Sequence, residues 1–275
     1  MSRLAGSRGP DQEIDVPANL VKRSVTIRNG GKKPPLFWVS PGFRQYDVIS
    51  QLAPGQPIYG VYAPEPKPDG PPLRFDQIAA YYVETILSSH PHGPYALTGW
   101  CAGAAVSFEI ARQLQSRGEA IRALIMIDPL DPGLSRAELV RDPALFKVRF
   151  NFHRALFHLH KMEESSLGAK WDYCTRSMAL FLERLKGNVP LPAEVLHIKR
   201  PDLYAFRNYL LQTYAGSGTI IRPHNFKYAF EYANRRWAQL MNHGLEVQEI
   251  PGDYESMWVD PGAGVMSRII NFCLS

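Results

Sequence analysis

The stretch Tyr95-Ala-Leu-Thr-Gly-Trp-Cys-Ala-Gly-Ala-Ala-Val-Ser-Phe-Glu-Ile-Ala-Arg112 reads as a short apolar strand, a sharp turn and a helix. Within it, Gly99-x-Cys101-x-Gly103 matches the strand–turn–helix pattern G-x-S-x-G, with cysteine in place of serine. The two glycines let strand and helix approach closely, while the turn projects the side chain of residue 101 out of the sheet. The helix N-terminus would also favour the thiolate form of Cys101. The pattern predicts a nucleophile, and a buried structural cysteine is the plainer alternative.

Strands and helices alternate on both sides of this stretch. The apolar runs predict strands at Val21–Arg28, Leu36–Val39, Ile58–Tyr62, Tyr95–Thr98, Ala123–Ile127 and Glu246–Pro251. Helical spacing of apolar residues predicts helices at Phe75–His90, Ala102–Arg117 and Val265–Leu274. Such alternation indicates the α/β class, with a mostly parallel sheet between two layers of helices.

Two regions depart from this alternation. Residues 1–17 are polar and contain glycine and proline, which predicts a disordered leader. Residues 134–243 are rich in aromatic residues and histidine at helical spacing, and offer only Val195–Ile198 as a possible strand. They predict an α-helical insertion of the kind that forms a lid over a substrate site. The remainder, within residues 18–275, then forms one domain.

Composition limits the classes of partner. The chain has 275 residues, of which 45% are hydrophobic and 21% charged, as in ordinary globular proteins. The net charge of +5 comes from dispersed lysine and arginine, so we expect no nucleic-acid partner. No apolar run approaches the length of about 20 residues that a membrane span requires, and no signal peptide is visible. We therefore expect a cytoplasmic location and no membrane contact. The three scattered cysteines predict no metal site, and no permanently bound cofactor is expected.

Several stretches resemble the thioesterase domains of nonribosomal peptide and polyketide synthases, which have the α/β-hydrolase fold. They are Pro35-Leu-Phe-Trp-Val-Ser-Pro-Gly42, Gln56-Pro-Ile-Tyr-Gly-Val61, His92-Gly-Pro-Tyr-Ala-Leu-Thr-Gly-Trp-Cys-Ala-Gly103, Ala123-Leu-Ile-Met-Ile-Asp128 and Ile250-Pro-Gly-Asp-Tyr-Glu-Ser-Met257. The resemblance implies an α/β-hydrolase fold with a lid. It also implies an enzyme that takes an acyl group from the phosphopantetheine arm of an acyl or peptidyl carrier protein and transfers, cyclises or releases it.

The resemblance assigns further site residues. Asp128 stands where the family carries the acidic member of its catalytic triad, and Asp131 is a second candidate. The oxyanion hole would use the N–H of Ala102 together with that of Gly42 or Phe43.

The expected triad histidine is missing. In the family it follows Gly-Asp near the C-terminus, whereas here Gly252-Asp253 is followed by Tyr254. Other histidines are available as a base, and a lid histidine is one alternative; they are His153, His158, His160, His197, His224 and His243. We include Tyr254 among the candidate catalytic residues because its hydroxyl can orient a nucleophile or donate to a leaving group.

The combination of Cys101 and Tyr254 favours acyl transfer over hydrolysis. A thiolate attacks a thioester without a general base, whereas water must be deprotonated as it attacks. Tyrosine, with an ordinary pKa of about 10, is a poor base at neutral pH. Two alternatives remain open: a relative that binds acyl groups or a protein partner without hydrolysis, and an esterase of free small molecules.

Overall fold

The computed structural model describes residues 23–64, 73–132, 205–206, 209–224, 227–254 and 256–275. The predicted leader at residues 1–17 and the possible strand Val195–Ile198 lie outside these ranges. Within the described ranges, no helix has both the length and the apolar character required to cross a membrane.

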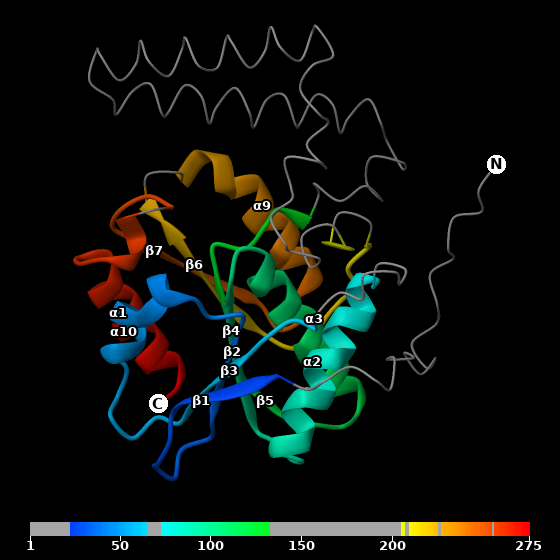
Figure 1. The fold of residues 1–275 in the computed structure, drawn as a ribbon. Helices are drawn as coiled ribbons and strands as arrows, with labels where there is room; N and C mark the ends of the chain where they lie inside the picture. Colours follow the sequence, from blue (N-terminus) through cyan, green and yellow to red (C-terminus); the bar gives the residue numbers. More distant parts are fainter. Residues whose placement is uncertain (1–22, 65–72, 133–204, 207–208, 225–226, 255) are drawn as a thin grey trace, which may run out of the picture.

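A seven-stranded sheet forms the centre of the structure, in the order β1-β3-β2-β4-β5-β6-β7 (Figure 1). Strand β1 pairs antiparallel with β3, and every other neighbouring pair is parallel. The strands are β1 (Ser24–Arg28), β2 (Leu36–Val39), β3 (Ile58–Val61), β4 (Tyr95–Trp100), β5 (Ile121–Ile127), β6 (Gly218–Pro223) and β7 (Leu245–Ile250). All parallel strands present their carboxyl ends at one edge of the sheet.

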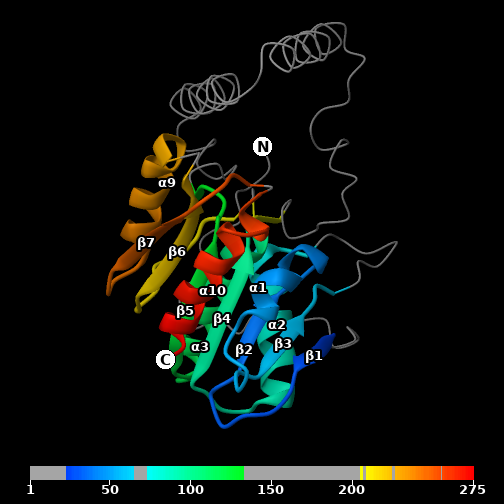
Figure 2. The same ribbon diagram turned by 90° about the vertical axis from the view of Figure 1, so that its left-hand side faces the viewer.

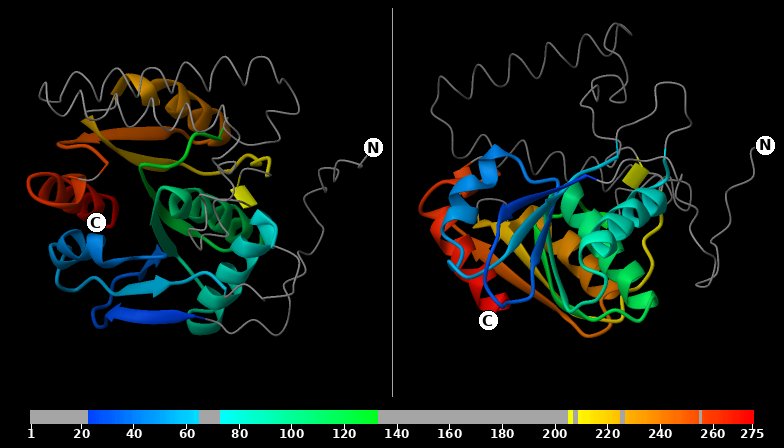
Figure 3. Two further views of the ribbon diagram at one scale, coloured as in Figure 1. Left: turned by 45° about the horizontal axis from the view of Figure 1, so that its top comes forward. Right: turned by 60° about the horizontal axis from the view of Figure 1, so that its bottom comes forward.

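Helices cover both faces of this sheet. Helices α1 (Tyr46–Ser50) and α10 (Gly262–Cys273) lie on one face (Figure 2). Helices α2 (Phe75–Ser89), α3 (Ala102–Ser116) and α9 (Lys227–Leu240) pack on the other, so that the sheet separates α1 and α10 from α2 and α3 (Figure 3). Two short 3-10 helices, η1 (Phe43–Gln45) and η4 (Ser256–Trp258), complete the connections.

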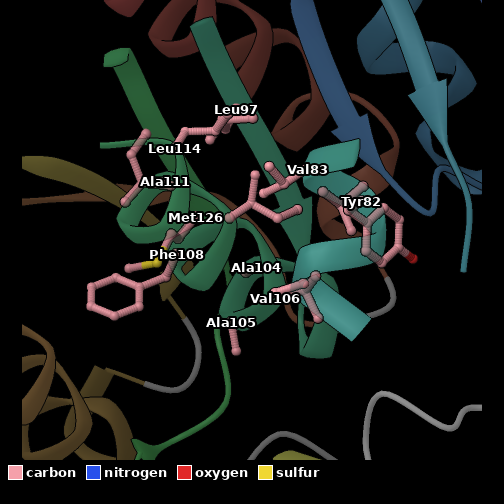
Figure 4. Packing of buried hydrophobic residues seen from close by; sticks show 14 of the residues in the cluster. Tyr82, Val83, Leu97, Ala104, Ala105, Val106, Phe108, Ala111, Leu114 and Met126 are labelled. Carbon is pink, nitrogen blue, oxygen red and sulfur yellow. The ribbon is translucent and has the colours of Figure 1, made fainter. Parts of the chain in front are cut away.

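The central strands are mostly apolar because each face has its own core. In β4, Tyr95 and Leu97 enter the core beneath α2 and α3, while Ala96 between them enters the core beneath α10. Figure 4 shows Leu97 on the first side, beside Leu114 of α3. Continuous apolar runs are the signature of strands buried on both faces.

The predicted α/β architecture is confirmed, and each strand and helix predicted outside residues 134–243 forms within a few residues of its expected ends. The predicted C-terminal boundary of the helical insertion, residue 243, is wrong, because strand β6 (Gly218–Pro223) of the central sheet lies before it. Its apolar run is only Ile220-Ile221, too short to stand out in the sequence. It becomes a strand because β5 and β7 hydrogen-bond to it on both sides.

Candidate active site

Cys101 occupies the turn between β4 and α3. Its backbone has φ 56° and ψ −114°, a conformation that a residue with a Cβ rarely adopts and that costs about 1–3 kcal/mol. The N–H of Cys101 donates to the carbonyl of Ile127, 2.9 Å away, which continues the β4–β5 ladder one residue beyond the strand. This is the strained, half-buried turn that the sequence predicts for a nucleophile.

The two glycines around Cys101 are required by close backbone contacts. A Cβ on Gly99 would collide with the carbonyl oxygen of Gly103 and would lie 2.8 Å from the hydroxyl of Ser107. A Cβ on Gly103 would lie 3.1 Å from the carbonyl oxygen of Val39 in β2. Strand and helix therefore meet at a separation that only glycine permits, which explains the spacing of the motif.

Backbone strain is concentrated at the carboxyl edge of the sheet. Among the described residues, three residues other than glycine have a positive φ: Ser40 (50°), Cys101 (56°) and Asp128 (43°). Each follows immediately on a strand, namely β2, β4 and β5. The hydroxyl of Tyr82 in α2 lies 2.8 Å from that of Ser40 and fixes the first of these turns. Strain of this kind clusters at functional sites, and this edge is where α/β sheets bind ligands.

Asp128, the predicted triad acid, is only 6% exposed and is paired with Arg222, a residue that no sequence motif marks. Its Oδ1 accepts a 2.7 Å hydrogen bond from Nη1 of Arg222, at the end of β6. The same nitrogen donates to the carbonyl of Pro129 at 2.8 Å, and Nε donates to Oδ1 of Asn234 at 3.1 Å. Burial raises the pKa of Asp128 and lowers that of Arg222, and the attraction between the two charges opposes both shifts.

In the sequence, Arg222 could have been recognised only as a charged residue that directly follows an apolar pair, in Ile220-Ile221-Arg222-Pro223. The pattern does not mark Arg222 as a site residue, because this segment lies within the predicted helical insertion.

The two predicted oxyanion donors differ in their present hydrogen bonding. The N–H of Ala102 belongs to the first turn of α3, where helical N–H groups have no acceptor within the helix. The N–H of Gly42 donates to Oε1 of Gln45 at 2.7 Å. In this conformation Gly42 is therefore engaged within its own loop, which leaves Phe43, at the start of η1, as the alternative that the sequence suggested. The oxyanion hole stays a prediction.

Tyr254 lies beside the turn that carries Cys101. Its half-buried ring packs on Trp100, the residue before Cys101, with 4.8 Å between ring centroids and a tilt of 37°. Trp100 also contacts Trp258 of η4 edge-on at 5.1 Å. The loop after β7 is thus held against the end of β4 by aromatic contacts. A chemical role of the Tyr254 hydroxyl stays a prediction.

The remaining candidates fall at different places. Asp131 is half-buried and its charge acts on Arg222. His224 follows β6 at the carboxyl edge, but it is exposed and its Nδ1 lies 2.9 Å from Oε2 of Glu249. His243 lies before the amino end of β7, away from Cys101. The other candidate histidines, His153, His158, His160 and His197, lie outside the described residues.

Comparison with known proteins settles the family. The profile described as Thioesterase domain matches residues 34–254, most of the chain. The chain belongs to the thioesterase domain family. This thioesterase domain is 36% identical over 107 residues to the polyketide synthase PksR of Bacillus subtilis (strain 168), covering 38% of the chain and 4% of PksR. It is 38% identical over 104 residues to the nonribosomal peptide synthetase apvA of Aspergillus terreus, covering 36% of the chain and 11% of apvA. The chain thus spans only a small part of these relatives.

Solved structures confirm the fold of the thioesterase domain. It superposes on the NocB thioesterase domain, in covalent complex with a fluorophosphonate nocardicin G analog, with a TM-score of 0.59 at 20% identity, over 92% of the chain and 99% of NocB's. The wild-type Vlm2 thioesterase domain gives a TM-score of 0.61 at 14% identity, over 94% of the chain and 100% of Vlm2's. The predicted family and fold are therefore both confirmed.

Proposed function

We propose that this thioesterase domain accepts an acyl group from the phosphopantetheine thioester of an acyl or peptidyl carrier protein and holds it on Cys101. The observation that carries the proposal is the strained turn at Cys101, with φ 56° and N–H groups of α3 beside it. A structural cysteine does not require such a conformation, whereas a nucleophile presented at the carboxyl edge does. The family membership of the chain supports a thioester as the substrate class.

The acylation step balances without a general base. The thiolate of Cys101 attacks the carbonyl carbon of the donor, forming a carbon–sulfur bond, and the pantetheine sulfur leaves with the electron pair of the broken bond. One thiolate and one thioester are present before and after the step. No proton is transferred overall, so the absence of histidine at position 254 does not obstruct acylation.

Release of the acyl group is more demanding when water is the acceptor. Water must lose a proton during attack, and a positioned base contributes about 10²–10⁴-fold to such a step. In the sequence, Tyr254 stands where the resemblance leads us to expect a histidine, and a tyrosine hydroxyl is mostly protonated at neutral pH. We therefore propose that transfer to a thiol, or to a nucleophile of the acyl chain itself, outpaces hydrolysis.

Intact-mass spectrometry with acyl-pantetheine donors tests the proposal. The protein is expected to gain the mass of the acyl group, and Cys101→Ala is expected to abolish the gain. Cys273→Ala is the matched control, because Cys273 is also half-buried but lies at the end of α10 near the amino ends of the strands. An adduct that persists in Cys101→Ala, or no adduct with any acyl chain, would exclude Cys101 as the acyl carrier.

A further inference from the structure

Arg222 stands in one row with the candidate nucleophile and the candidate triad acid. Two backbone hydrogen bonds extend the sheet one residue beyond its strands: Cys101 N–H to Ile127 O at 2.9 Å, and Asp128 N–H to Ile221 O at 2.8 Å. Since β4, β5 and β6 are neighbours, these bonds place residues 101, 128 and 222 at successive positions across the carboxyl edge.

The guanidinium of Arg222 reaches from β6 to the segment that follows β5. Its Nη1 reaches both Oδ1 of Asp128 and the carbonyl of Pro129, which belong to the segment that follows β5. The side chain is only 3% exposed, so its charge is little screened by water. Burial lowers the pKa of Arg222, and attraction to Asp128, to Asp131 and, least of all, to a charge on Cys101 opposes this shift.

We propose that Arg222 is an electrostatic positioning residue, which stabilises the thiolate of Cys101 as the fixed cation of the row Cys101–Asp128–Arg222. The inference rests on the proposed function, in which Cys101 is the nucleophile. Arg222 cannot act as a base, because a guanidinium keeps its proton in proteins. It differs from a triad imidazolium in that its charge does not disappear near neutral pH.

This arrangement gives Asp128 a different task from that of a triad acid. A triad aspartate orients and charges a histidine, whereas Asp128 orients the guanidinium and compensates its burial. Its own negative charge opposes formation of the thiolate. Removing the Asp128 charge alone should therefore lower the pKa of the Cys101 thiol. Removing the charges of both Asp128 and Arg222 should give a thiol pKa higher than that in the variant without the Asp128 charge alone.

Other ionisable groups at this edge of the sheet could also affect the titration of Cys101. Asp131 lies in the loop after β5, while Asp253 and Tyr254 lie in the loop after β7, with Tyr254 packed on Trp100. His224 and Glu249, at the ends of β6 and β7, are paired with one another. None of these groups is altered in the variants below, so a change in the titration of Cys101 reports on the Arg222–Asp128 pair.

The test is the pH dependence of Cys101 alkylation by iodoacetamide, quantified on the Cys101 peptide by mass spectrometry. Asp128→Asn keeps the cation and a hydrogen-bond acceptor, and is expected to lower the titration midpoint relative to the unaltered protein. The double variant Arg222→Met/Asp128→Asn is expected to have a midpoint higher than that of Asp128→Asn by about one pH unit, a tenfold change in thiolate at a given pH. Arg222→Lys, which keeps the charge, is expected to stay within a few tenths of the unaltered protein.

A purely structural role of Arg222 makes a different prediction. If Arg222 is only structural, the variants change in thermal stability, but the midpoint of Cys101 alkylation is the same in Asp128→Asn and in the double variant. That result would overturn the inference. The double variant removes both partners of the buried pair, which proteins tolerate far better than loss of one. Alkylation needs no acyl donor. A responsive midpoint without an acyl adduct would therefore refute the proposed function alone, and an adduct with an unresponsive midpoint would refute this inference alone.

Discussion

Nη1 of Arg222 and Oδ1 of Asp128 are 2.7 Å apart in an ion pair whose side chains are 3% and 6% exposed. The pair joins the ends of β5 and β6 beside the turn that carries Cys101. Asp128, the candidate triad acid, therefore has the buried guanidinium of Arg222 as its partner.

Breaking this pair on one side should be costly. Arg222→Met leaves the Asp128 carboxylate buried without its cation, which costs about 3–5 kcal/mol of unfolding free energy. Arg117→Met is the matched control, because Arg117 pairs with Glu84 at 2.6 Å but both side chains are 39% exposed. Such a surface pair contributes about 0–1 kcal/mol. Urea unfolding measures both, and equal losses in the two variants would contradict the buried character of the Arg222 pair.

Gly99, the first glycine of the motif around Cys101, should not accept a methyl group. In Gly99→Ala the new Cβ meets the carbonyl oxygen of Gly103, so β4 and α3 must move apart and the turn at Cys101 must change. We expect a clear drop in melting temperature together with slower alkylation of Cys101. Gly55→Ala is the control, because a Cβ at Gly55 meets nothing within 4 Å. A Gly99→Ala variant as stable and as reactive as Gly55→Ala would show that the close contact is not required.

Restoring a base at position 254 should favour water as acceptor. Tyr254→His places an imidazole where the family carries one, so hydrolysis of the acyl adduct is expected to rise by at least about tenfold. Tyr254→Phe keeps a ring for packing on Trp100 and removes the hydroxyl, and it is expected to hydrolyse the adduct no faster than the unaltered protein. Loss of the adduct is followed by intact mass. Unchanged hydrolysis in Tyr254→His would indicate that another residue already acts as the base.

Alkaline stability should depend on Tyr95. Burial, with a smaller contribution from Glu119, raises the pKa of its hydroxyl to about 12, and the hydroxyl donates a 2.7 Å hydrogen bond to the carbonyl of His90. The folded state therefore retains a proton that the unfolded chain releases near pH 10, so stability falls as the pH rises from about 10 to 12. Urea unfolding of Tyr95→Phe should show a smaller decline over this range, and about 1 kcal/mol less stability at pH 7. Tyr46→Phe, at a ring 70% exposed, controls for loss of a hydroxyl as such.

Most of the fold could be predicted from the sequence because buried parallel strands leave unbroken apolar runs, such as Leu36–Val39. The strained turn at Cys101 was equally predictable, since close packing forces glycine at positions 99 and 103. Strand β6 was missed because only Ile220 and Ile221 mark it, and its pairing depends on neighbours distant in the chain. The partnership of Arg222 with Asp128 could not be predicted for the same reason, because it requires the order of β5 and β6 in the sheet.

The acyl group on Cys101 and its preference for a thiol acceptor can be followed in one time course. The protein is acylated with an acyl-pantetheine donor, the adduct is mapped to the Cys101 peptide, and its loss is then compared in buffer and in added pantetheine. We predict an adduct at Cys101 that pantetheine discharges at least about tenfold faster than water does, since only the reaction with water needs a base. An adduct on another residue, or equal loss with and without the thiol, would contradict this account.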